Sequence, residues 1–267
     1  MITYSTVFKD VDAIRTVSPL VHNITNYVVM NNTANALLSI GASPVMAHAV
    51  EEVKDMASIA SSLVINMGTL SEKWVEAMII AGKTAFERKI PVIFDPVGVG
   101  ATEYRTKMAS KIITDCKPTV IRGNGSEIMA LTNANIKTKG VDSTMSTHSA
   151  LDSAKLLASE TGAIVVISGP EDFITDGSTT ISTKNGSDLM AKVTGMGCTA
   201  TAIIGAFTAV NSDYLEATAH AMAVMSIAGE ISADVSKGPG SMQINFIDQL
   251  YNLSEKDIEN RLKLSYE

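Results

Sequence analysis

Short apolar runs alternate with helix-like segments along most of this chain, and this alternation restricts the fold more than any other feature. The apolar runs indicate strands at residues 20–24, 42–46, 62–69, 90–94, 118–125 and 163–168. Segments with helical spacing stand between them, among them residues 28–40, 50–56, 74–88 and 150–161. Such alternation is typical of βαβ units with right-handed crossovers. We therefore expect an α/β fold of three layers, with a mostly parallel sheet covered by helices on both faces.

Length and composition favour one domain. A chain of 267 residues allows one large α/β domain or two smaller ones. Hydrophobic residues make up 46% of the chain but aromatic residues only 5%, so the core consists of Ala, Val, Ile, Leu and Met. This is the usual filling between helices and a parallel sheet. We expect a single domain over residues 1–267.

Charge and cysteine content exclude several classes of protein. The net charge of −7 and the lack of a basic run argue against nucleic-acid binding. Cys116 and Cys198 are far apart and form no C-x-x-C pattern, so neither a disulfide framework nor a structural zinc site is expected. The first ten residues do not resemble a signal peptide. We expect a cytoplasmic protein.

The stretch from Val193 to Ala200 is the first candidate for a functional site. Gly195 and Gly197 stand just before an uncharged run of small and apolar residues, which indicates a loop that turns into a helix. The free N–H groups and the dipole of such a helix end favour an anion, most often a phosphate. A close-packed turn without a ligand is the alternative. Residues 193–210 are also about long enough for a membrane span, but they are rich in Gly, Ala and Thr, and we expect no membrane association.

Polar residues and glycines follow several of the expected strands. In parallel sheets the ligand lies beyond the carboxyl ends of the strands. We expect the site to gather there the residues Gly68, Asp95, Arg122, Ser168 and the turn at Gly195. Farther along, the Asp176-Gly177 and Asn185-Gly186 pairs indicate a small antiparallel insert.

Asp95 and Glu127 are candidates for a shared Mg²⁺ site, because carboxylates that follow successive strands can converge on one ion. The alternative is structural, since Asp before Pro forms turns and Glu in the first turn of a helix suits the dipole. Arg122 can hold a phosphate with two N–H groups, and a surface ion pair is its alternative role.

Cys198 stands at the expected helix start, where the pKa of a thiol should fall below its reference of about 8.5. It can serve as a nucleophile, as a proton acceptor or as a small buried filler. The histidines of the chain share no spacing typical of a metal site or a catalytic triad.

Several stretches together resemble the hydroxyethylthiazole kinases, a family within the ribokinase-like superfamily. The resemblance runs through essentially the whole chain, and the stretches that carry it lie at residues 21–28, 41–46, 95–101, 121–127 and 195–198. The resemblance implies transfer of the γ-phosphate of ATP, with Mg²⁺, to the hydroxyl of 4-methyl-5-(2-hydroxyethyl)thiazole in thiamine salvage. It also implies a homotrimer with the thiazole site between subunits.

The resemblance assigns roles to individual residues. Asn124 and Glu127 match the N-x-x-E motif that organises the metal, and Asp95 is placed to assist. Arg122 and Ser168 match positions that contact ATP. The positions that match thiazole contacts are Met46 and Gly195, with Asn26 and Gly68 as neighbours, and the expected catalytic group is Gly195, Gly197 and Cys198.

Cys198 departs from the wider superfamily, whose sugar and vitamin kinases usually carry an Asp there as the base. A loose phosphoryl-transfer transition state needs little early deprotonation. We therefore expect residues 195–198 to act mainly as backbone donors to the transferring phosphoryl group, with Cys198 a weak proton acceptor at best.

Three other functions compete with this one. Cys198 and the stretches at Asn26 and Met46 argue against another kinase or a hydrate dehydratase of the same fold. A nucleotide sensor without activity would not need Asp95, Arg122 and Glu127. An NAD-linked dehydrogenase is disfavoured because the G-x-G lies late in the chain and has no third glycine.

Overall fold

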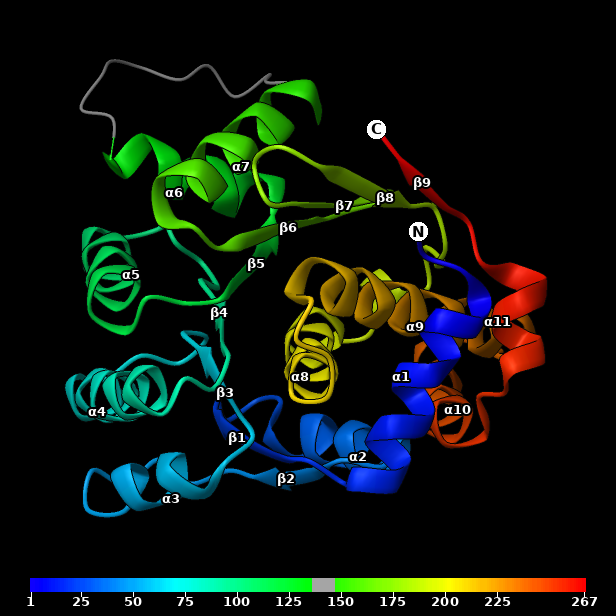
Figure 1. Cartoon of the computed structure of the whole chain (residues 1–267), viewed down its shortest axis with the longest axis horizontal. Helices are drawn as coiled ribbons and strands as arrows, with labels where there is room; N and C mark the ends of the chain where they lie inside the picture. The colour runs from blue at the N-terminus through cyan, green and yellow to red at the C-terminus, as the bar shows by residue number, and fades with distance from the viewer. Residues whose placement is uncertain (136–146) are drawn as a thin grey trace.

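One sheet of nine strands runs through the part of the molecule that the computed structural model describes, residues 1–135 and 147–267 (Figure 1). In space the strands follow the order β2-β1-β3-β4-β5-β6-β7-β8-β9, parallel from β2 to β6 and antiparallel from β6 onward. Their bounds are β1 (Leu20–Ile24), β2 (Ser43–Val45), β3 (Ser62–Asn66), β4 (Val92–Asp95), β5 (Val120–Asn124), β6 (Ile164–Ser168), β7 (Asp172–Thr175), β8 (Thr180–Thr183) and β9 (Leu264–Tyr266). The expected α/β fold with a mostly parallel sheet is confirmed.

Helices cover both faces of the sheet. One layer consists of α3 (Val53–Ile59), α4 (Glu72–Arg88), α5 (Glu103–Cys116), α6 (Gly125–Asn135) and α7 (Thr147–Thr161), each packed against the next. The other layer consists of α1 (Tyr4–Val17), α2 (Met30–Ile40), α8 (Met196–Thr208), α9 (Tyr214–Val235), α10 (Pro239–Asn252) and α11 (Glu255–Arg261). A short 3₁₀ helix, Met190–Lys192, precedes α8.

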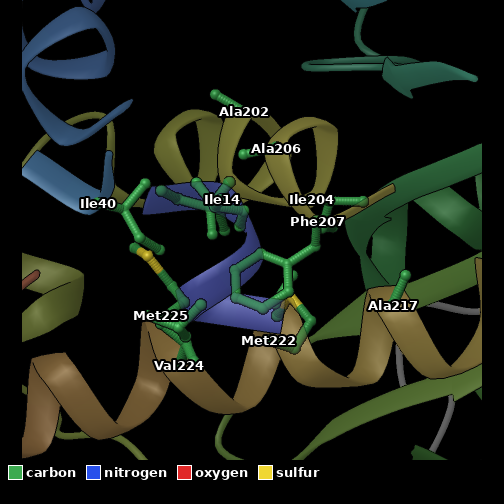
Figure 2. Packing of buried hydrophobic residues seen from close by; sticks show 14 of the residues in the cluster. Ile14, Ile40, Ala202, Ile204, Ala206, Phe207, Ala217, Met222, Val224 and Met225 are labelled. Atoms are coloured by element: carbon green, nitrogen blue, oxygen red, sulfur yellow. The ribbon is translucent and has the colours of Figure 1, made fainter. Parts of the chain in front are cut away.

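Alternation along the strands divides the core into two parts. On β3, Val64 joins the cluster around α8 and α9, while Leu63 and Ile65 join the cluster under α4 and α5. This follows from the period of two in a strand. Figure 2 shows how α8 fills the first cluster: the apolar residues that meet there come from four helices, namely Ile14, Ile40, Ala202, Ala206, Phe207, Met222 and Met225.

The structure confirms the expected antiparallel segment as β7 and β8, and β7 also pairs with β6, so this segment extends the main sheet. β9, which pairs with β8, was not expected. The uncharged run after Gly195 forms a helix of 13 residues inside the protein, and among the described helices none is long and apolar enough to span a bilayer.

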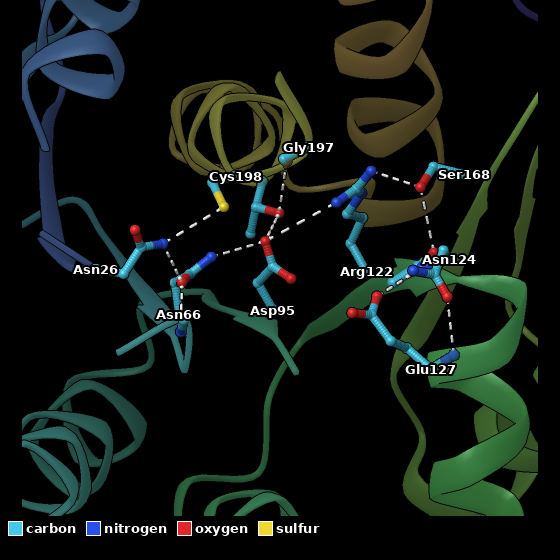
Figure 3. Close-up of polar contacts among 12 residues, drawn as sticks. Asn26, Asn66, Asp95, Arg122, Asn124, Glu127, Ser168, Gly197 and Cys198 are labelled. Atoms are coloured by element: carbon cyan, nitrogen blue, oxygen red, sulfur yellow. Dashed lines mark hydrogen bonds and ion pairs between the residues drawn. The ribbon is translucent and has the colours of Figure 1, made fainter. Parts of the chain in front are cut away.

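The carboxyl ends of the parallel strands meet at one edge of the sheet. Asn66 at the end of β3 is level with Asp95 at the end of β4. In the same way Asn124 at the end of β5 is level with Ser168 at the end of β6. The first turn of α8 lies over the β3 and β4 ends (Figure 3). This register brings together side chains that are far apart in the sequence.

Candidate active site

The turn before α8 has the shape that its glycines predict. Gly195 is the N-cap of α8 with a φ of 86°, which only glycine adopts easily, and its carbonyl accepts the first helical bond, from Thr199 N at 2.8 Å. A Cβ on Gly195 would lie 2.7 Å from Cγ1 of Val29, so the backbone and the segment before α2 are in close contact. The predicted loop-to-helix turn is confirmed, and its first N–H groups have no partner within the helix.

Arg122 brings a second positive group to this helix end. A Cβ on Gly197 would lie 2.6 Å from Nη1 of Arg122, so the guanidinium packs directly on the glycine. Its Nη2 donates to Oγ of Ser168, while Nε is buried without a hydrogen-bond partner in residues 1–135 and 147–267 (Figure 3). The side chain is only 12% exposed. A largely buried guanidinium beside the positive end of a helix is a pair of positive groups that favours an anion, and Asp95 is the anionic side chain nearest to it. A surface ion pair, the alternative role, does not describe this buried group.

Asp95 supplies the negative charge nearest to Arg122. Its Oδ2 lies 3.9 Å from Nη1 of Arg122 and accepts hydrogen bonds from Nδ2 of Asn66 at 2.9 Å and from Oγ1 of Thr201 at 2.8 Å. Oδ1 is buried and has no partner among the described residues. Burial raises the pKa of Asp95 to about 6, although Arg122 and the two donors oppose that shift. The carboxylate therefore offers one bare oxygen to a cation or a polar group.

Asn26 and Asn66 connect Asp95 to Cys198. Nδ2 of Asn26 donates to Oδ1 of Asn66 at 2.8 Å and to Sγ of Cys198 at 3.5 Å. Oδ1 of Asn66 also accepts from Gly68 N at 2.9 Å. Figure 3 shows this row of side chains under the first turn of α8. The structure thus brings the predicted residues Asn26, Gly68 and Cys198 together.

The expected lowering of the Cys198 pKa is wrong. Burial raises the pKa of the thiol to about 11, and the nearby charge of Asp95 raises it further, against weaker effects of Asn66, Asn26 and Arg122. A helix N-terminus stabilises an anion by only about 0.3–1 kcal/mol at the surface. The loss of water and a like charge outweigh that effect, so the thiol stays protonated at neutral pH.

Asn124 and Glu127 form a reciprocal cap at the start of α6. Oδ1 of Asn124 accepts from Glu127 N at 3.0 Å, and Oε2 of Glu127 accepts from Asn124 N at 2.9 Å. This is the geometry of a capping box. Oε1 of Glu127 accepts from Gly98 N at 2.9 Å, which ties the loop after β4 to α6. The structural alternative for Glu127 is therefore present, and it leaves further lone pairs on the carboxylate free.

The metal prediction is untested by these contacts. The charge of Glu127 acts on Asp95, so the two carboxylates are near enough to interact. In the part of the chain that the structure describes, no three His, Cys, Asp or Glu side chains form a cluster that could bind a metal. A cation at Asp95 would therefore need ligands from substrate or water, as is usual for Mg²⁺.

Met46 is a predicted site residue that lies away from the row of side chains formed by Asn26, Asn66 and Asp95. It follows β2, the edge strand of the sheet, and its carbonyl accepts from Nδ1 of His48 at 3.2 Å. None of the contacts found within the described ranges links its side chain to Cys198 or Asp95. Within one chain, the structure does not join Met46 to the rest of the site.

Sequence reasoning missed three residues. Asn66 and Thr201 hold Asp95, and Arg105 of α5 donates to the carbonyls of Met67 at 2.6 Å and Gly68 at 2.8 Å. The signal for Asn66 was present, because it ends a strand next to the strand that ends in Asp95. Arg105 stands at a polar position of a helical segment, and nothing in the sequence distinguishes it from an ordinary surface arginine.

A cavity of about 600 Å³ opens beside Arg122 and Ser168. Four methionines form part of its apolar wall, and Asp172 is buried in it; burial raises the pKa of that carboxyl to about 6. The cavity continues to Gly197 and Ala200 on α8, so it reaches the start of this helix from the side of β6. The methionines are Met190, Met196, Met222 and Met225.

The fold is shared with small-molecule kinases of the ribokinase-like class. Pyridoxal kinase from Staphylococcus aureus superimposes with a TM-score of 0.66 over 93% of this chain and 98% of that chain, at 16% sequence identity. This similarity shows that the chain has the ribokinase-like fold.

Closer comparisons define the family. The model of the hydroxyethylthiazole kinase family matches residues 11–256. Hydroxyethylthiazole kinase of Syntrophus aciditrophicus (strain SB) is 53% identical over 264 residues, which cover 98% of each chain. The structure of the hydroxyethylthiazole kinase protein from Pyrococcus horikoshii OT3 has a TM-score of 0.92 at 38% identity, over 98% of this chain and 99% of that chain. This chain belongs to the hydroxyethylthiazole kinase family.

Proposed function

We propose that this protein transfers the γ-phosphate of ATP to the hydroxyl of 4-methyl-5-(2-hydroxyethyl)thiazole, a step of thiamine salvage. The observation that carries the proposal is the packing of Arg122 against Gly197. It places the guanidinium group and the positive N-terminal end of α8 side by side. A phosphoryl group in transfer is the anion that this chemistry fits. Membership of the family supports the thiazole alcohol as the acceptor.

ATP would occupy the cavity beside Arg122 and Ser168. The methionine wall suits a flat, apolar base, because thioethers pack well against rings. Arg122 and the N–H groups of residues 196–198 would hold the transferring phosphate. The thiazole alcohol would approach from the opposite side, where Asn26, Gly68 and Gly195 lie.

The residues present fit a role for Mg²⁺. The bare, buried Oδ1 of Asp95 is an oxygen acceptor of the type that Mg²⁺ prefers. Asn124 ends the neighbouring strand β5, and Glu127 lies in the first turn of α6. When bound, the ion would neutralise phosphate charge. The negative charge of Asp95 and the positive charge of Arg122 would then partly neutralise each other. Glu127 would hold the loop at Gly98 in place.

Positioning and charge neutralisation would carry most of the rate. With a pKa of about 11, Cys198 holds its proton at neutral pH and is poorly suited to act as a base. Its N–H lies in the first turn of α8, beside that of Gly197. Both backbone groups would stabilise charge on the phosphoryl oxygens, which is the main task in a loose transition state.

A homotrimer with the thiazole site between subunits is part of the proposal. Met46 follows an edge strand of three residues, and near this edge Tyr27, Val28 and Leu38 are 65%, 62% and 59% exposed. Large apolar side chains that stay exposed favour a subunit contact. Sedimentation analysis of the purified chain tests it, and a monomer at micromolar concentration would refute it.

We further propose that residues 1–267 act as a single domain, and a cytoplasmic location stays a prediction.

A substrate panel tests the function. Purified protein is incubated with ATP, Mg²⁺ and one alcohol at a time, and ADP and the phosphorylated product are measured. The thiazole alcohol should be phosphorylated with kcat/KM at least about 10²-fold above that for pyridoxal or hydroxymethylpyrimidine. ADP release without any alcohol, or preference for pyridoxal, would overturn the proposal. No turnover with any alcohol would favour a nucleotide sensor instead.

A further inference from the structure

Asn66 is a buried polar residue between the two halves of the site. It ends β3, is 1% exposed and uses both ends of its amide. Nδ2 donates to Oδ2 of Asp95, and Oδ1 accepts from Nδ2 of Asn26 and from Gly68 N (Figure 3). A side chain that only filled space would not need three polar partners at 2.8–2.9 Å.

The carboxylate of Asp95 sets the direction of this row of hydrogen bonds. An ionised carboxylate only accepts, so Asn66 must turn its NH₂ group toward Asp95 and its oxygen toward Asn26. Asn26 must then turn its own NH₂ group toward Asn66. Its oxygen accepts from Val28 N at 3.1 Å, which agrees with that orientation. The remaining N–H of Asn26 points to Sγ of Cys198.

The same row fixes the backbone at Gly68. A Cβ on Gly68 would lie 2.4 Å from Nδ2 of Asn26, so the two are in direct contact. Gly68 N is bound by Asn66, and its carbonyl is bound by Arg105 at 2.8 Å. The groups on the acceptor side therefore cannot move independently of Asp95.

We propose, on the basis of the function proposed above, that Asn66 is a positioning residue for phosphoryl transfer. It couples Asp95 on the phosphate side to Asn26 and Gly68 on the alcohol side, and it fixes which N–H groups face the acceptor hydroxyl. Asn66 itself contacts neither ATP nor the alcohol. Its effect is on the alignment of the two substrates.

Steady-state kinetics of Asn66→Ala test this role. We expect kcat to fall by about 10–10²-fold and KM for the alcohol to rise, because small misplacements of reacting groups are costly. KM for ATP should change by less than about 3-fold, since Arg122 and Ser168 are untouched. Asn23→Ala is the matched control: Asn23 is a fully buried asparagine on the neighbouring β1, and its side chain donates to the carbonyl of Val21. It should keep wild-type KM values and kcat per folded molecule.

Two further variants separate positioning from packing. Asn66→Asp has nearly the same shape but cannot donate to Asp95, so it should lose more kcat than Asn66→Ala. A role in packing alone predicts the reverse order. In a double-mutant cycle, adding Asn26→Ala to Asn66→Ala should cost less than about 3-fold more, because both act in one row.

The outcomes are distinguishable. If the wild type phosphorylates the thiazole alcohol but Asn66→Ala keeps wild-type kcat and KM per folded molecule, or if the cycle is additive, the role of Asn66 is refuted and the function stands. If the wild type does not phosphorylate the thiazole alcohol, the proposed function fails first. The folded fraction of each variant is measured by circular dichroism.

Discussion

Asp95 and Glu127 follow neighbouring parallel strands, yet the chain holds the two carboxylates in opposite ways. Asp95 is fully buried, and donors from Asn66 and Thr201 converge on one of its oxygens, while the other stays bare. Glu127 is half-buried and accepts one backbone N–H on each oxygen, one of them from Gly98. Two carboxylates near the ends of neighbouring strands therefore do not need to have similar roles.

The difference lies in what each carboxylate stabilises. Burial costs Asp95 free energy whenever it is ionised, and a buried charge without full pairing is typical of functional sites. Glu127 closes a helix cap and holds a loop, so its bonds stabilise the fold itself. We infer that Asp95 mainly serves chemistry, and that Glu127 mainly serves structure and would support the proposed Mg²⁺ only indirectly.

Asp95→Asn should have the largest effect on activity. The amide has no charge to balance Arg122 and would turn its own NH₂ toward a donor. We expect kcat/KM to fall by about 10³-fold, with the folded structure retained, because charge stabilisation is lost in the transition state. Coupled ADP assays with both substrates varied measure this. A loss below about 10-fold would remove Asp95 from the chemistry.

The same substitution should change how stability depends on pH. The pKa of Asp95 in the folded protein, about 6, lies above its ordinary value of 3.8 because of burial, so the ionised form is disfavoured in the folded state. Stability of the wild type therefore falls as pH rises from about 4 to 6, by about 3 kcal/mol from this group. Asp95→Asn removes that loss and should be relatively more stable at pH 7 than at pH 4, as urea unfolding would show.

Asp172→Asn offers a second test of this reasoning. Burial raises the pKa of Asp172 to about 6 as well, so its replacement should change the pH dependence in the same direction. An unchanged pH profile of unfolding in both variants would contradict the assignment of buried, destabilising charges.

Glu127→Gln should have a smaller effect on activity than Asp95→Asn and the opposite effect on stability. The amide keeps one acceptor for Gly98 N or Asn124 N but turns an NH₂ group toward the other. We expect a loss of about 1–2 kcal/mol in unfolding free energy and of about 10-fold in kcat. Thermal unfolding and the kinase assay measure both. Equal activity losses in the two variants, with Glu127→Gln as stable as the wild type, would contradict the different roles assigned to the two carboxylates.

Cys198→Ser should have the smallest effect. The thiol is protonated at neutral pH, so its replacement by a hydroxyl removes no base. We expect kcat to fall by less than about 10-fold, well below the roughly 10²–10⁴ that general-base catalysis contributes. Complete inactivity of a folded Cys198→Ser enzyme would show that the thiol itself is essential.

The sequence predicted the frame of the site better than its interior. Asp95, Arg122 and Ser168 could be placed together because parallel strands end at one edge. The orientation of their side chains depends on Asn66 and Thr201, and an asparagine at a strand end is more often a turn former. The direction of the pKa shift of Cys198 could not be predicted either. The helix end can be recognised from the local sequence, but the burial of the thiol and its distance to Asp95 depend on the whole fold.

Titration of a non-hydrolysable ATP analogue with Mg²⁺ into the wild type and Gly197→Ala tests the central claim most directly. The added methyl group would displace the Arg122 guanidinium, which lies 2.6 Å away. If Arg122 and the start of α8 form the phosphate site, the variant should bind the analogue at least about 10-fold more weakly. It should bind the thiazole alcohol alone as the wild type does. Equal affinity of both proteins for the analogue would contradict the claim.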